Sequence, residues 1–243
     1  MKRLLLILFS MACLGLQGQV VSSSTWFAPA VNLAERTYLD VLNDGNTEAR
    51  YIAHADYITI VTGVSVWADS TANGKDLLEA NTSYQAAFAG DSIIFTNDQL
   101  KLDPFAVSQP ITIYAVMAQT SWTSEDEILW LKDSDGNVMM QQLVGTPSIN
   151  LTTTGGISNS DLVLSTLSIV RVVINTTSSK VQVNEETAAT GDGSTRTMTM
   201  LQLGDNSYCA EMYIKEVIVR SVDDSDSDEM LIVDFLNAKY TVY

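Results

Sequence analysis

From residue 57 onward, the chain alternates short apolar or β-branched runs with stretches rich in Gly, Asn, Asp and Ser. Such runs, bounded by turn-forming residues, are typical of strands in a β-sandwich or barrel. The pattern therefore predicts an all-β fold of two antiparallel sheets, with a hairpin turn at residues 132–137. The predicted strands are residues 57–61, 92–95, 111–118, 128–132, 138–143, 162–164, 169–174, 180–184, 197–203 and 213–220.

The C-terminal part of the chain has a different period. Ser, Asp and Glu at residues 225–229 are suited to begin a helix, because they cap backbone N–H groups and complement the positive end of the helix dipole. These acids lack the spacing of an EF-hand loop, so we interpret them as a cap rather than as a calcium site. A short C-terminal helix is predicted, and its apolar stripe consists of Leu231, Ile232, Phe235 and Leu236.

The first residues have the pattern of a signal peptide. Lys2 and Arg3 precede the apolar run 4–16, which is too short to span a bilayer. Cleavage after Gly18 predicts a mature chain that is secreted or held at the cell surface and is not inserted into a membrane. A weak lipobox before Cys13 makes a lipoprotein the alternative. The predicted organisation is a signal peptide at 1–18, an N-terminal extension at 19–50 and one domain at 51–243.

The acidity of the chain excludes some partners. Thirteen Lys and Arg against 29 Asp and Glu give a net charge of −16, which becomes −18 once Lys2 and Arg3 leave with the signal peptide. Nucleic-acid binding needs clustered basic side chains, so we expect no nucleic-acid partner. Anionic membranes are excluded for the same reason. Ca²⁺ is a candidate ligand, although the sequence assigns no metal-binding residues.

Several segments match, in order, the pattern of a known family. Residues 67–77 read WADSTANGKDL, close to W-x-D-x-S-G-N-G-x-D-L, and residues 92–98 read SIIFTND, close to F-D-G-x-x-D. The runs PITIYAV, KVQVN, LQLG and MYIKEVIV follow, and the chain nears its end with FLNAKY. Together they resemble the concanavalin A-like lectin/glucanase domains of the laminin-G-like kind. The resemblance implies a jelly-roll β-sandwich with a short C-terminal helix over residues 51–243.

Most of the matching residues have structural interpretations. We expect Trp67 to be a buried anchor of the sandwich. Asp69 and Asn73 are expected to shape a turn, and Glu216 to accept hydrogen bonds from backbone donors at a sheet end. The chain departs from the family pattern at three places: at Thr96, at Glu185, and at Glu211 or Met212. The last two departures replace Gly, so the local turns must differ.

The candidates for catalysis are few. Glucanases of this fold carry Glu-x-Asp-x-Glu on one strand, whereas this chain has the compressed run 125–127. Glu125 and Glu127 share one face of an extended strand and form the alternative catalytic pair of a glycoside hydrolase. We favour an acidic turn there, because adjacent like charges repel. Cys209 is unpaired once Cys13 leaves with the signal peptide, has no evident link to His54, and is interpreted as a buried, inert thiol.

Binding is better supported than catalysis. Lectin-like sites combine exposed aromatic rings with Asp or Asn acceptors, often beside calcium. Trp122 and Tyr208 are the candidate aromatic residues in loops, and Asp205 and Asn206 are the candidate oxygen donors. For each of these residues, an ordinary surface or core role is the alternative.

The sequence thus predicts a secreted, non-catalytic lectin-like domain that recognises glycans or a cell-surface polymer. The step from fold to function is analogy, because this fold supports many functions. One alternative is a structural or adhesion module, on a cell or virion surface, that binds protein. The others are a glycoside hydrolase of the same fold and a spacer without a ligand.

Overall fold

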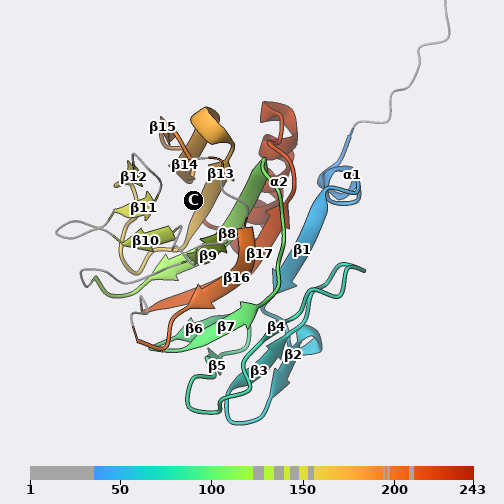
Figure 1. Ribbon diagram of the computed structural model, residues 1–243, viewed down its shortest axis with the longest axis vertical. Helices are drawn as coiled ribbons and strands as arrows, with labels where there is room; N and C mark the ends of the chain where they lie inside the picture. Colours follow the sequence, from blue (N-terminus) through green and yellow to red (C-terminus); the bar gives the residue numbers. More distant parts are fainter. Residues whose placement is uncertain are drawn as a thin grey trace, which may run out of the picture. The chain divides into compact units, whose positions relative to one another are not determined.

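The strongest apolar runs of the sequence form the centre of one large sheet. In β8 (Ile111–Gln119) and β13 (Ser168–Ile174) every residue is buried, which a strand achieves only when both faces of its sheet are covered. The molecule is seen in a computed structural model (Figure 1). The model describes residues 36–122, 129–133, 140–142, 148–152, 156–193, 195, 198–207 and 211–243.

This large sheet has eight strands, all paired antiparallel. The strands follow the order β15-β14-β13-β8-β17-β6-β5, and β1 pairs with the C-terminal half of β17. The remaining strands are β1 (Thr47–Ile52), β5 (Ala87–Phe88), β6 (Ile93–Phe95), β14 (Ser179–Val183), β15 (Ala189–Gly191) and β17 (Met212–Arg220).

A second sheet of six strands packs on the inner face of the first. Its order is β2-β3-β4-β7-β16-β9, and a separate sheet, β10-β11-β12, has three strands. The bounds are β2 (Ile58–Ile60), β3 (Val64–Trp67), β4 (Leu77–Leu78), β7 (Gln99–Leu102), β9 (Leu129–Asp133), β10 (Met140–Gln142), β11 (Ile149–Leu151), β12 (Ile157–Asn159) and β16 (Met198–Gly204).

The main hydrophobic core lies between the sheets. Its large members include Trp67, Phe95 and Phe105, and all three are buried. The indole of Trp67 donates from Nε1 to the carbonyl of Ile52 at 2.9 Å, so its one polar atom is satisfied inside the core. The predicted all-β sandwich is therefore confirmed, as is the role of Trp67 as a buried anchor.

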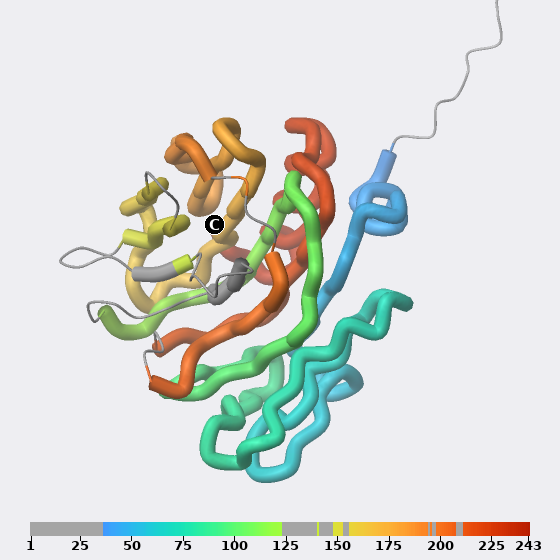
Figure 2. The backbone as a smooth tube through the Cα atoms, in the orientation of Figure 1, coloured from blue at the N-terminus to red at the C-terminus, as the bar shows by residue number. Residues whose placement is uncertain are grey.

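Two helices cover the outer face of the eight-stranded sheet. α2 (Asp226–Tyr240) begins where it was predicted, with Ser225 accepting from the backbone N–H of Asp228, and α1 (Tyr38–Leu42) packs beside it (Figures 1 and 2). Two 3₁₀ turns, η1 (Ala55–Tyr57) and η2 (Thr176–Ser178), complete the elements. The second apolar cluster, under the helices, consists of Val41, Leu42, Tyr114, Val116, Ile169, Ile218, Ile232, Val233 and Leu236.

Two local predictions are wrong. Residues 162–164 form a loop, in which Leu162 is buried in the core while Val163 is 60% exposed. The chain turns here because Ser165 has a positive φ of 59° and donates its backbone N–H to the carbonyl of Gln119. β9 and β10 belong to different sheets, so their described residues do not form the predicted hairpin. Residues 134–137 of that turn lie outside the described part of the chain.

Residues before position 51 also belong to the eight-stranded sheet. β1 runs across residue 51, where the sequence places the start of the domain, and residues 36–243 form one compact unit. The predicted signal peptide lies outside the described residues and stays a prediction.

The packing of α2 predicts a large cost for removing an apolar side chain from its inner face. Leu236 is 1% exposed, so Leu236→Ala is expected to lower the free energy of unfolding by about 2–5 kcal/mol, because a cavity remains under the helix. Met230 on the same helix is 59% exposed, and Met230→Ala is expected to change it by less than about 0.5 kcal/mol. Urea unfolding of both variants measures the contrast, and equal effects would contradict the packing described.

Candidate functional site

The loop of residues 68–76 covers one edge of β1. β1 pairs with β17 along its other edge, so this edge would otherwise expose unpaired backbone groups. Arg50 donates its backbone N–H to Asp69 Oδ1 at 2.9 Å, and the carbonyl of Arg50 accepts from the backbone N–H of Ser70 at 2.8 Å. Much of the conspicuous W-x-D motif therefore serves to close the edge of the sheet.

Asp69 and Asn73 hold this loop in place, as the sequence predicted. The buried carboxylate of Asp69 accepts from the backbone N–H groups of Thr71 and Lys75, at 3.0 and 3.2 Å, and from the Thr71 hydroxyl at 2.6 Å. Asn73 Nδ2 donates to the carbonyls of Thr47 and Glu48 at 2.9 and 3.0 Å. The loop is thus fixed to β1 by side chains as well as by its backbone.

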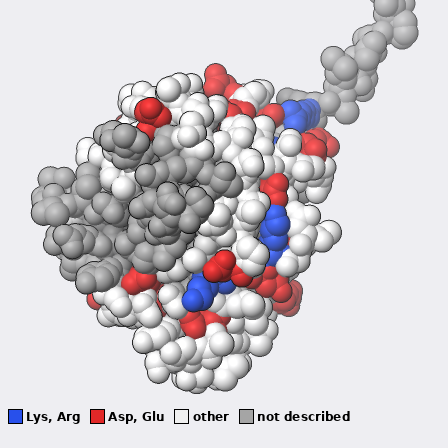
Figure 3. Space-filling model, viewed as in Figure 1, with Lys and Arg blue, Asp and Glu red and all other residues white. Residues whose placement is uncertain are grey.

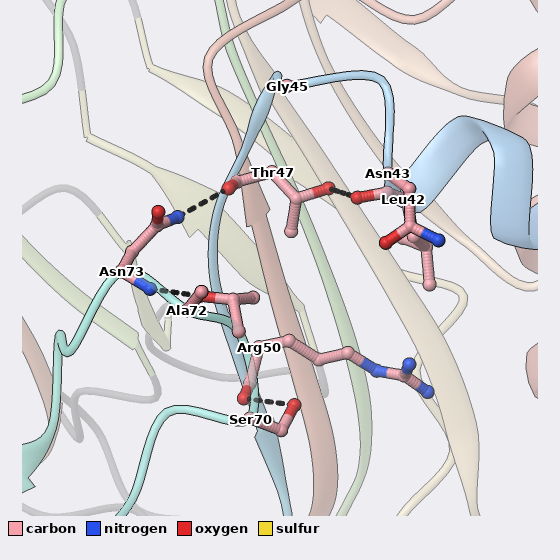
Figure 4. A pocket seen from close by; sticks show the side chains of 9 residues that line it. Leu42, Asn43, Gly45, Thr47, Arg50, Ser70, Ala72 and Asn73 are labelled. Atoms are coloured by element: carbon pink, nitrogen blue, oxygen red, sulfur yellow. Dashed lines mark hydrogen bonds between the residues drawn. The ribbon is translucent and has the colours of Figure 1, made fainter.

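A polar pocket opens on the outer side of β1, and we call it the β1 pocket. Its volume is about 300 Å³, and it lies between the end of α1, the first residues of β1 and the covering loop (Figure 4). Nine residues line it: Leu42, Asn43, Gly45, Thr47, Arg50, Ser70, Thr71, Ala72 and Asn73.

The pocket presents amide and hydroxyl groups. Within the described chain, the side-chain amide of Asn43 makes no hydrogen bond, and Oδ1 of Asn73 accepts none. The hydroxyl of Ser70 donates to the carbonyl of Arg50 at 2.9 Å, and a hydroxyl oxygen keeps acceptor capacity when it donates. The pocket therefore offers both donors and acceptors to a polar ligand.

Arg50 contributes the charged group of the pocket. Its Nε donates to Glu216 Oε1 at 2.7 Å, and its guanidinium carbon lies 5.5 Å from the centroid of the Phe235 ring. The terminal nitrogens Nη1 and Nη2 have no partner among the described residues. In Figure 4 the side chain extends from β1 toward the side where Asn43 and Leu42 lie.

The hydrogen-bond partners of Glu216 differ from those expected from the sequence. Its carboxylate, fully buried on β17, accepts from side chains rather than from backbone donors: Arg50 Nε, Lys239 Nζ at 2.6 Å and the Tyr240 hydroxyl at 2.7 Å. The register of β17 against β8 shifts just before Glu216. Burial and the neighbouring Glu216 charge raise the pKa of Tyr240, which keeps its hydroxyl a donor.

A second buried charge, Arg220, lies beneath the pocket. Its guanidinium is fully buried and each of its three nitrogens has an acceptor, so the charge is compensated. The acceptors are the carbonyl of Val41, the Thr47 hydroxyl, and the carboxylates of Asp44 and Asp224. Thr47 thereby links this network to the β1 pocket.

Three of the four binding residues predicted from sequence, Trp122, Asp205 and Asn206, lie elsewhere, at one end of the sandwich. Trp122 follows β8, while Asp205 and Asn206 follow β16, and Thr120 bonds to Glu211 to join the two loops at 2.7 Å. Asp205 is 6% exposed, and its carboxylate accepts from Ser207 and Gln202 within its own segment.

Trp122 is half-buried, and its Nε1 has no hydrogen-bond partner within the described chain. Tyr208, Cys209, Glu125 and Glu127 lie outside the described residues, so their predicted roles stay predictions.

A further hollow lies on the outer side of the six-stranded sheet. It has a volume of about 380 Å³, and no aromatic side chain lines it. Like the β1 pocket, it offers no ring on which a sugar could stack. Its lining consists of Leu78, Glu79, Ala80, Asn81, Lys101, Leu102 and Asp103.

The charged side chains are dispersed rather than gathered. On the face seen in Figure 3, acidic and basic residues stand in small neighbouring groups on a largely uncharged surface. Among the described residues, no three His, Cys, Asp or Glu side chains are grouped so that they could hold a metal ion. No helix in the described ranges is long and apolar enough to cross a membrane.

Comparison with known proteins places the fold. No protein-family model and no curated protein matches the chain. The Trypanosoma rangeli sialidase in complex with sialic acid superimposes with a TM-score of 0.60 at 11% identity, over 80% of this chain and 33% of the sialidase. A point mutant of HCR/D superimposes with a TM-score of 0.56 at 10% identity, over 79% of this chain and 51% of that chain.

These similarities show a shared all-β sandwich fold. The chain spans about a third of the length of the sialidase and about half that of HCR/D. At these identities, nothing about activity transfers with the fold.

The ion pairs beside the pocket predict an acid-sensitive contribution to stability. Burial raises the pKa of Asp44, but hydrogen bonds from the Asn46 backbone and Arg220 outweigh it, so the pKa lies below its ordinary value. A carboxyl group with a depressed folded-state pKa stabilises the fold above its unfolded-state pKa of about 3.9, and this contribution is lost as pH falls through the folded-state value.

Asp44→Asn is therefore expected to be less stable than the parent protein between pH 5 and 8, and the difference should shrink below pH 4. Urea unfolding across this pH range measures it. Asp56, whose side chain is 82% exposed, provides the control, because Asp56→Asn should have a small effect at every pH. A difference for Asp44→Asn that persists unchanged at pH 3 would contradict the role of the carboxylate charge.

Proposed function

We propose that the protein is a secreted or cell-surface, non-catalytic glycan-binding domain of the concanavalin A-like kind, and that the β1 pocket is its binding site. The observation that carries the proposal is the set of polar groups in the pocket that have no partner among the described residues: the Asn43 amide, Asn73 Oδ1 and the terminal nitrogens of Arg50. Sugars present many hydroxyl groups, each of which donates and accepts, and such a set of side chains matches them.

The size of the pocket supports a small ligand group. A volume of about 300 Å³ lies at the lower end of ligand sites. It suits one sugar ring at the end or side of a longer glycan. The surrounding framework is rigid, because α1, β1 and the covering loop are held by Arg220, Asp69 and Asn73. A rigid site loses little entropy on binding.

The comparisons lend support at the level of fold. The sialidase of which this chain matches 33% is in complex with sialic acid, so the fold occurs within a protein that binds a glycan component. The loop end with Trp122, Asp205, Asn206 and Tyr208 stays the second candidate glycan site, with Ca²⁺ as a candidate ligand. The hydrolase with Glu125 and Glu127 and the protein-binding adhesion module stay the functional alternatives.

The test blocks the pocket without removing any hydrogen bond. Ala72 lines the pocket and is exposed, so Ala72→Trp fills the space while the covering loop keeps its contacts. Ala55 on η1 is also exposed and lies outside the pocket lining, so Ala55→Trp is the matched control. The readout is binding to a glycan array, followed by calorimetry with the best glycan.

We expect Ala72→Trp to weaken glycan binding at least about tenfold, which corresponds to about 1.4 kcal/mol. Ala55→Trp should bind as the parent protein does. Loss of binding in Trp122→Ala but not in Ala72→Trp would move the site to the loop end, and dependence of that binding on added Ca²⁺, tested with EDTA, would add a metal. A parent protein that binds no glycan on the array would contradict the proposed function.

A further inference from the structure

We infer that the ligand of the β1 pocket carries a carboxylate, as a uronic or nonulosonic acid residue does, and that Arg50 pairs with it. The inference rests on the proposed function, because it names the class of glycan that the same pocket takes. It follows from the orientation, the partners and the charge balance of this one guanidinium.

Arg50 is oriented before any ligand arrives. Its Nε is bound to the buried Glu216, and its guanidinium lies over the ring of Phe235. That ring is itself stacked on Tyr38, with the centroids 3.8 Å apart and the planes at 11°. Because Glu216 holds its Nε and Phe235 covers one of its faces, the guanidinium loses little rotational freedom when its remaining nitrogens bind an anion.

The other described arginines are already occupied at their terminal nitrogens. Arg36 contacts Asp44 and Asp228, and Arg171 contacts Glu229 and Gln182. Arg220 is fully compensated beneath the pocket. Among these residues, Arg50 is the arginine whose two terminal nitrogens have no partner in the described chain.

The charge around Arg50 favours an anion. Arg50 and Lys239 share the single carboxylate of Glu216, so this group carries one excess positive charge in a chain whose net charge is −16. The next pair along, Lys75 with Glu48, is neutral. The network beneath the pocket, where Arg36 and Arg220 meet Asp44, Asp224 and Asp228, holds one excess carboxylate that Arg220 and Arg36 engage rather than Arg50. One added carboxylate therefore balances the group formed by Arg50, Lys239 and Glu216. A polymer with dense phosphate or sulfate charge would require several basic side chains, whereas the lining of the β1 pocket contains one, Arg50.

The fork of Arg50 and the charge of its group together favour a carboxylate, because a phosphate fits the same fork but brings more negative charge than the group lacks. Arginine presents N–H groups in a planar fork, which matches the two oxygens of a carboxylate. The amides of Asn43 and Asn73 and the hydroxyl of Ser70 line the same pocket and suit the hydroxyls of the ring that bears the acid. A carboxylated sugar thus uses both kinds of group, which a neutral sugar or a free carboxylate does not.

The experiment compares each acidic glycan with its carboxyl-reduced form. The probes are an oligosaccharide ending in glucuronate, one ending in a nonulosonate, and the counterparts in which the carboxylate has become CH₂OH. Calorimetry with the full chain measures all four. Hydrogen bonds between charged groups predict that at least one acidic form binds about ten- to a hundredfold more tightly than its reduced form.

Arg50→Lys tests the assignment to this residue, because it keeps the charge and removes the fork. We expect the preference for the acidic form to fall at least about fivefold, while affinity for the reduced form stays within about twofold. Lys101→Gln removes an exposed positive charge outside the pocket lining and should leave the preference intact. Thermal unfolding of both variants checks that they are folded.

The outcomes separate this inference from the function on which it rests. Equal affinity of the parent protein for acidic and reduced forms would overturn the carboxylate while leaving a neutral-glycan site in place. A preference that survives in Arg50→Lys but disappears in Lys101→Gln would place the anion elsewhere and overturn the role of Arg50. Because the parent protein alone reports the preference, the carboxylate can be refuted even if Arg50→Lys fails to fold.

Discussion

A single buried carboxylate, Glu216, joins three parts of the molecule that are far apart in sequence. It lies on β17 and accepts from Arg50 on β1 and from Lys239 and Tyr240 on α2. Removing one partner of a buried ion pair costs about 3–5 kcal/mol, because the remaining charge is left uncompensated. Edge strand, central strand and helix are therefore held in one arrangement, and the β1 pocket inherits its geometry from that arrangement.

The second constraint is that the eight-stranded sheet is covered on both faces. The six-stranded sheet packs on one side and the helices on the other, which explains why β8 and β13 read as continuous apolar runs. A charged side chain buried in this outer layer needs ion-pair or hydrogen-bond partners. Arg220 has such partners in Asp44, Asp224 and Thr47. The polar pocket occurs at the margin of this layer, where β1 and α1 meet solvent.

The sequence predicts the strongly patterned parts of this structure. β8, β13 and β17 contain long apolar runs and α2 has an apolar stripe at helical spacing, and all four were expected. Strands β4 and β5 have two residues each, which is too few to show a period in the sequence. Residues 162–164 are apolar and therefore resemble a strand, although Leu162 is buried as part of a loop that packs on the core. The β1 pocket was missed because its residues come from separate segments. The available signal was one charged residue inside each of two strand-like runs, Arg50 in TEARYI and Glu216 in MYIKEVIV. These runs form the paired strands β1 and β17.

The contact between Arg50 and Glu216 joins residues that are 166 positions apart. A chain that emerges from the ribosome N-terminus first therefore holds β1 without its pairing strand, and the covering loop without a sheet to close, until β17 has been made. The β1 pocket takes its described form only after β17 and α2 have been made, since they orient the Arg50 guanidinium. A nascent chain that lacks β17 and α2 therefore does not present this arrangement of side chains.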